Sequence, residues 1–77
     1  MTIKTLPPDP EGENGNYASY AALAVKAFRK RTKSDPEDVL SDLLGDLMHW
    51  ADRNDMNFDR ELERARDHYR YETEEIE

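Results

Sequence analysis

The chain has 77 residues, a mass of 9.0 kDa and a formal charge of -7 at pH 7, from 18 acidic and 11 basic side chains. This length provides one small domain with a marginal core, and because the chain contains no cysteine, disulfides are excluded as its support. The acidic total argues against direct nucleic-acid binding, and the lack of a long apolar run excludes a transmembrane helix.

The N-terminal region is predicted to be a disordered, flexible tail over residues 1–15, followed by one helical domain over residues 16–77. Prolines and glycines interrupt any regular element in the tail, namely Pro7, Pro8, Pro10, Gly12 and Gly15. The region also lacks the apolar segment of a signal peptide, so we expect a cytoplasmic protein.

A first helix is predicted at residues 17–32. Its aromatic and small apolar side chains recur at steps of three and four residues and therefore share one face: Tyr17, Tyr20, Ala21, Ala24 and Phe28. Five basic side chains lie between Lys26 and Lys33, where they favour the C-terminal end of the helix dipole.

A second helix is predicted at residues 35–53, with Ser34 or Asp35 as its cap, Pro36 in its first turn and Glu37 or Asp38 closing a capping box. The helical wheel divides cleanly. One half holds the apolar side chains Val39, Leu40, Leu43, Leu44, Leu47, Met48, Trp50 and Ala51. The other half holds Asp38, Ser41, Asp42, Gly45, Asp46, His49, Asp52 and Arg53.

A third helix is predicted at residues 57–73, with Asn57 as its cap and a narrow apolar stripe of Phe58, Leu62, Ala65, Tyr69 and Ile76. The charged neighbours Glu61, Arg64 and Glu72 account for His68 beside this stripe without a site. The sequence therefore predicts an all-α fold, a small three-helix bundle in which short connections favour antiparallel neighbours.

The second helix is expected to be central, because its apolar arc is wider than one neighbour can cover. The other two helices offer few large aliphatic side chains, so part of this arc is predicted to stay uncovered. That uncovered patch favours a homodimer over a monomer, or a docking site for another protein.

The candidate interaction surface combines the polar half of the second helix with its aromatic edge: Asp38, Asp42, Asp46, His49, Trp50 and Arg53. His49 is expected to be solvated and paired with Asp46 or Asp52 rather than to act as a ligand or base. Trp50 is expected to anchor the edge of the core, the alternative being an interface residue. Gly45 indicates either a close approach to the helix or a neutral substitution.

The segment "DLLGDLMHWADRNDMNFDRELERARDHYRYE" resembles a family of small helical proteins from bacteria, phages and plasmids that has no established function. Its shared pattern is D-L-M-H-W-x-D-R-N, then F-D, then R-A-R-x-H-Y. The matching positions are Asp46, Leu47, Met48, His49, Trp50, Asp52, Arg53, Asn54, Phe58, Asp59, Arg64, Ala65, Arg66, His68 and Tyr69. The resemblance covers roughly residues 17–72 and implies a small helical protein carried on mobile elements.

Three functions are compatible with these features. The first is a noncatalytic protein–protein interaction module whose partner is another protein or a second copy. The second is an acidic inhibitor or nucleic-acid mimic, in which Asp38, Asp42 and Asp46 form a ladder at four-residue steps.

The third function is enzymatic, because residues 37–55 and 58–69 resemble the all-helical nucleotide pyrophosphohydrolases of the MazG type. These enzymes bind magnesium through carboxylates on adjacent helices, and Asp42 and Asp46 lie one turn apart. However, the E-E-x-x-E helix of that family has no counterpart, since residues 17–32 contain no acid. A zinc pair of His49 and His68 is not supported by spacing or by cysteine. We therefore predict no catalytic, cofactor-binding or metal-binding residues.

Overall fold

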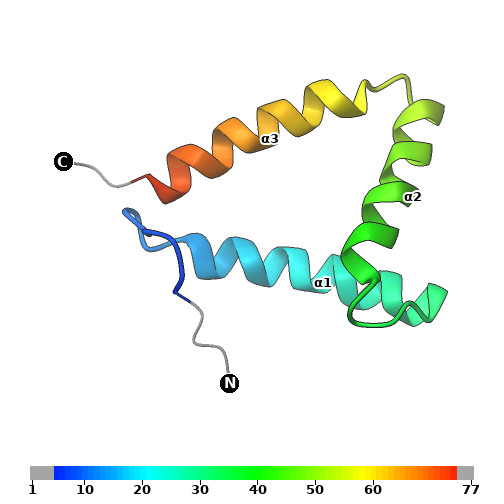
Figure 1. The fold of residues 1–77 in the computed structure, drawn as a ribbon, viewed down its shortest axis with the longest axis horizontal. Coiled ribbons are helices and arrows are strands. Elements are labelled where there is room, and N and C mark those ends of the chain that lie inside the picture. Colours follow the sequence, from blue (N-terminus) through cyan, green and yellow to red (C-terminus); the bar gives the residue numbers. More distant parts are fainter. Residues whose placement is uncertain (1–4, 75–77) are drawn as a thin grey trace.

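The computed structural model describes residues 5–74 and contains three helices: α1 (Asn14–Thr32), α2 (Val39–Arg53) and α3 (Phe58–Thr73) (Figure 1). Within these residues there is no strand, which confirms the predicted all-α fold of three helices. Residues 1–4 of the predicted tail and residues 75–77 of the predicted domain, Ile76 included, lie outside the described residues. Residues 5–13 form neither helix nor strand, and their flexibility stays a prediction.

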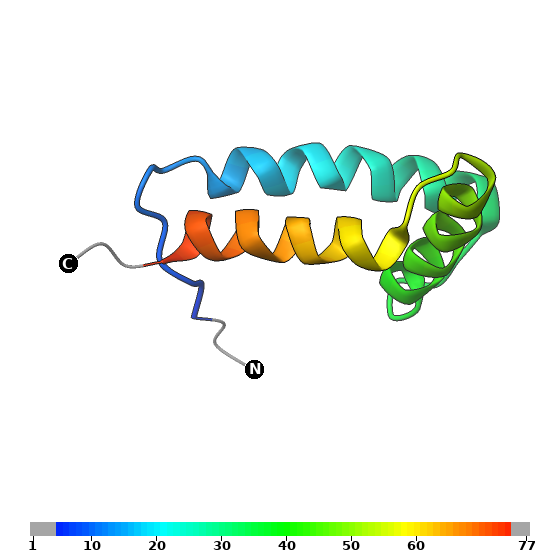
Figure 2. The same cartoon turned by 90° about the horizontal axis from the view of Figure 1, so that it is seen from above.

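The three helices form an open frame. Figures 1 and 2 show α1 and α3 running in opposite directions, with α2 spanning the distance between the end of α1 and the start of α3. α2 contacts both of the other helices, as its broad apolar arc predicts. At the opposite corner the side-chain amide of Asn14 donates a hydrogen bond to the carbonyl oxygen of Glu72, 3.1 Å away. This bond closes the frame.

The frame encloses very little core. The radius of gyration over Cα atoms is 14.7 Å, whereas a compact domain of this length measures roughly 11–12 Å. Ala51 is the one buried apolar residue among the described residues. No helix in the described part of the chain is long and apolar enough to cross a membrane.

The start of α2 differs from the prediction. The helix begins at Val39 instead of residue 35, because residues 36–38 form a tight turn in which the Asp38 amide donates to the Asp35 carbonyl, 3.0 Å away. The first helical bond runs from the Asp42 amide to the Asp38 carbonyl. The predicted capping box is therefore absent, and the Ser34 hydroxyl donates to the Asp42 carboxylate.

The start of α1 also differs, since the helix begins at Asn14 rather than residue 17. Asn14 is held by residues outside the helix: its amide donates to the Asp9 carboxylate and its side chain to the carbonyls of Pro8 and Glu72. The predicted end at Thr32 is confirmed, and Lys33 stops the helix in a left-handed conformation with a φ of 63°.

The cap of α3 is the one that the sequence predicts. The side-chain oxygen of Asn57 accepts a hydrogen bond from the Arg60 amide at 3.0 Å, and α3 follows from Phe58. We expect Asn57→Ala to lower the free energy of unfolding by about 1 kcal/mol, because one amide of the first turn loses its acceptor. Urea denaturation measures this loss, with Asn57→Ser as the control that retains a capping oxygen. Equal stability of the alanine and serine variants would contradict the assignment.

Candidate functional site

The six residues of the predicted interaction surface all lie on α2 or at its N-cap, and all are exposed: Asp38, Asp42, Asp46, His49, Trp50 and Arg53. Asp38 is the N-cap residue, and Asp42 lies in the first turn, where carboxylates stabilise a helix through its dipole. At the other end, Arg53 donates to the backbone carbonyl of His49 at 3.3 Å. Asp38, Asp42 and Arg53 therefore interact with the ends of their own helix.

The carboxylates of this surface do not converge on a common point. Asp38, Asp42 and Asp46 are spaced along one helix, about 6 Å apart for each four-residue step. Among the described residues, no group of three histidine, aspartate or glutamate side chains is arranged to hold a metal ion.

His49 does not form the ion pair expected of it. The ion pairs of the described residues join Glu61 to Arg64 and Asp67 to Arg70, both on α3. The expected pairing with Asp46 or Asp52 is therefore wrong. An exposed pair gains little in water, so each side chain is solvated separately.

The apolar half of α2 is the more unusual surface. Four of its large side chains share one face and remain exposed to 66% (Leu40), 39% (Leu44), 39% (Leu47) and 48% (Met48). We call these four residues the α2 apolar face. Trp50, at the edge of this half, is 55% exposed, so the expectation that it anchors a core edge is wrong for a single chain. The predicted uncovered patch is present, because these side chains stay exposed although α2 contacts both α1 and α3.

One end of the same half of α2 is covered by the chain itself. The amides of Asn54 and Met56 both donate to the carbonyl of Ala51, at 3.1 and 3.0 Å, which folds the turn back over the helix end. The Ala51 residue itself is only 5% exposed. The uncovered part therefore runs from Leu40 to Met48.

Gly45 lies in the middle of α2, and nothing within the chain approaches it. A Cβ atom added there would meet no atom within 4 Å. The close approach considered from the sequence is therefore not made by any other part of the described chain.

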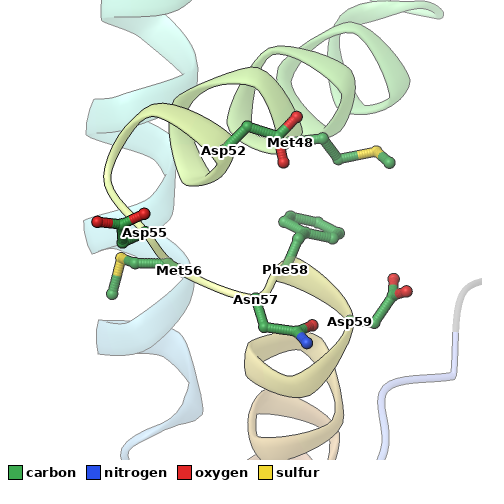
Figure 3. Close-up of a pocket in the computed structure, with 7 residues that line it drawn as sticks. All are labelled: Met48, Asp52, Asp55, Met56, Asn57, Phe58 and Asp59. Atoms are coloured by element: carbon green, nitrogen blue, oxygen red, sulfur yellow. The ribbon is translucent and has the colours of Figure 1, made fainter.

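A shallow pocket of about 500 Å³ lies at the corner between α2 and α3 (Figure 3). The phenyl ring of Phe58 lies beside Met48 and Asp52, whereas Asp55 and Asp59 lie on opposite sides of the ring. Met56 and Asn57 complete the lining. The carboxylates therefore lie around the rim of the pocket. The pocket itself is an open depression where α2 meets α3.

A second pocket, of about 540 Å³, lies at the opposite corner of the frame. Its lining comes from the N-terminal segment, the start of α1 and the end of α3: Leu6, Pro7, Asp9, Asn14, Gly15, Tyr17, Ala18, Tyr69, Glu72 and Thr73. The sequence analysis missed this pocket, because its parts are far apart in the chain and no periodic pattern links them.

Tyr17 in this second pocket has a raised pKa. Partial burial raises the pKa of its phenol above the ordinary value of 10.0, and the carboxylates of Glu72, Glu13 and Glu11 raise it further. We expect Glu72→Gln to lower the pKa of Tyr17, as measured by NMR titration of the tyrosine ring carbons. An unchanged Tyr17 pKa would contradict the proximity of the two side chains.

The same shift gives a pH dependence of stability with a defined sign. The folded state holds the phenol proton more tightly than the unfolded state does. The stabilising contribution is therefore fully present below the unfolded pKa near 10 and is lost as the pH rises through the higher folded value. Denaturation above pH 10 measures this loss, which should be smaller in Tyr17→Phe.

Comparisons of the chain with protein-family models, curated proteins and solved structures find no match. The resemblance carried by residues 46–69 therefore stays a prediction.

Proposed function

We propose that this chain is a noncatalytic protein–protein interaction module that binds through the α2 apolar face. The observation that carries the proposal is the exposure of Leu40, Leu44, Leu47 and Met48 on one side of one helix. A contiguous apolar surface on a small protein is typical of an interaction site. The face contains no charged side chain, so a partner can cover it without burying a charge.

The α2 apolar face supplies part of the energy of binding. Complete burial of a leucine or methionine side chain contributes about 1.5–3 kcal/mol, and the side chains of this face are roughly half exposed. Covering them gives on the order of 4 kcal/mol before Trp50 or any polar contact is included. Trp50 lies beside the face, and tryptophan is strongly enriched among residues that dominate binding energy.

A function as an acidic mimic of nucleic acid would use the opposite half of α2. This alternative has less support. Asp42 accepts a hydrogen bond from Ser34, so one carboxylate of the ladder has a local structural role. Catalysis has less support again, because the carboxylates of the described residues are spread along α2 and around the rim of the corner pocket.

Two substitutions that add one negative charge to opposite halves of α2 test the proposal. Leu40→Asp places a carboxylate on the α2 apolar face, in the first turn of the helix, where the helix dipole favours it. His49→Asp places the same charge on the polar half. Two differently tagged forms of the protein are co-expressed in source cells and captured, so that both self-association and other partners are detected.

The proposal predicts that Leu40→Asp loses its bound protein, whereas His49→Asp and the unmodified chain retain it. Circular dichroism of each protein shows whether the helices persist when the partner is lost. Loss of binding in His49→Asp alone would instead support the polar half and the acidic mimic. Retention by all three proteins would overturn the proposal.

A further inference from the structure

We infer that the α2 apolar face is covered by a second copy of this chain, which makes the protein an obligate homodimer joined through α2. The inference rests on the proposed function and names its partner. Four observations carry it: the pattern of the face, the amount of uncovered surface, the lack of a core and the distribution of charge.

The pattern of the face suits pairing with an identical helix. Leu40, Leu44, Leu47 and Ala51 follow one another at steps of four, three and four residues, which is the spacing of a coiled-coil seam. Ala51 is already buried within the single chain, so the open seam runs from Leu40 to Met48 and is centred on Leu44. An antiparallel pair about a twofold axis at Leu44 sets Leu40 of one copy opposite Met48 of the other. The two helix dipoles then run in opposite directions, which is favourable.

The uncovered area is that of a homodimer subunit. The chain exposes 7229 Å², whereas a compact monomer of 9.0 kDa exposes roughly 4,900 Å². The excess is about 2,300 Å², part of which belongs to the N-terminal segment. The excess is spread over the open frame, and the α2 apolar face is one part of it. Obligate homodimers bury roughly 1,000–2,500 Å² from each subunit, so the open frame has enough uncovered area for such an interface.

The lack of a core explains why the partner is a second copy. With Ala51 as the one buried apolar residue of the described chain, the frame has almost no interior to hold it together. The protein that covers the α2 apolar face must therefore be present in every cell that makes this chain. A second copy always meets that condition, and obligate homodimers commonly have no stable folded monomer.

Charge supports the same partner. α1 carries Lys26, Arg29, Lys30 and Arg31 without any acid between them, and α2 carries a ladder of aspartates. Within the described residues, the ion pairs join side chains of α3 alone. The aspartates of the ladder lie on the half of α2 opposite the α2 apolar face, so a contact between two copies through that face buries no carboxylate and leaves the ladder in water.

Sedimentation equilibrium of the full chain provides the first test. We expect a mass twice the 9.0 kDa of the monomer, with dissociation and loss of helical circular dichroism occurring together on dilution. The single tryptophan reports on the same event, because covering Trp50 shifts its emission to shorter wavelength and protects it from quenching by iodide.

Cross-linking tests the predicted contact in a chain that has no cysteine of its own. Leu44→Cys lies at the proposed twofold axis, and His49→Cys lies on the opposite half of α2. We expect a short bismaleimide to join two Leu44→Cys chains at least ~10-fold more efficiently than two His49→Cys chains, because the dimer holds the first pair of thiols at high effective concentration.

The outcomes separate this inference from the proposed function. A monomer at all concentrations that is loosely folded and binds an apolar dye overturns the second copy but supports a different protein as the partner. A monomer that unfolds cooperatively and binds no such dye overturns both. A dimer that cross-links through His49→Cys in preference to Leu44→Cys overturns the assignment of the interface to the α2 apolar face.

Discussion

Replacement of Leu47 by aspartate is expected to lower the free energy of unfolding by roughly 3 kcal/mol or more, measured by urea denaturation at a fixed protein concentration. Leu47 is already the better-covered part of the α2 apolar face, with 39% of its surface exposed. Its helical neighbours at three and four residues are Leu43, Leu44, Trp50 and Ala51, so a carboxylate at this position has no compensating partner among them. In the proposed dimer the second copy buries the same carboxylate further, which lowers the free energy of unfolding still more.

Leu47→Met is the control for this prediction, because it conserves volume and apolar character. Its loss should be below about 1.5 kcal/mol. The midpoint for Leu47→Asp should also become insensitive to protein concentration, since the dimer no longer forms. Equal stability of Leu47→Asp and Leu47→Met would show that the α2 apolar face stays exposed to water and is covered by no partner.

Phe58→Ala is expected to lower the free energy of unfolding by about 2 kcal/mol, roughly half the cost of removing a fully buried phenylalanine. Phe58 is the first residue of α3 and is half-buried at the corner with α2, beside Met48 (Figure 3). Few other apolar side chains join these two helices, so the loss of the ring should loosen α3 from α2. Thermal and urea denaturation followed by circular dichroism measure the effect.

Met56→Ala provides the matched control at the same corner. Met56 lines the pocket but is 44% exposed and lies in the turn, so its removal should cost less than about 1 kcal/mol. A similar loss from both substitutions would show that the corner is held by the turn rather than by the ring.

The sequence predicts the helices well, because a single helix is determined by short-range patterns. The alternation of Leu40, Leu44 and Leu47 with aspartates at intermediate positions defines both halves of α2, and Asn57 identifies the start of α3 by its capping oxygen. The predicted starts of α1 and α2 are wrong by three and four residues. At the start of α1 the long-range bond from Asn14 to the end of α3 accompanies the earlier start, and at the start of α2 a local turn between Asp35 and Asp38 replaces the expected cap.

The open arrangement could not be predicted, for a physical reason. Periodicity shows that Leu40 and Trp50 lie on the apolar half of a helix, but it does not show whether that half is covered by the same chain. The bond between Asn14 and Glu72 joins residues 58 positions apart and has no signature in the local sequence. The prediction of an uncovered patch rests instead on the small number of large aliphatic side chains in the other two helices. That number is a property of the whole chain and not of one local pattern.

The bond between Asn14 and Glu72 also indicates where the chain can be circularly permuted. It brings the first residue of α1 and the last turn of α3 to one corner, away from α2. A short linker could therefore join the two ends of the frame into a circularly permuted chain with new termini in the turn between α2 and α3. Fusion partners attached at the natural corner would extend away from α2, so two cargoes could be carried by one dimer without obstructing its seam.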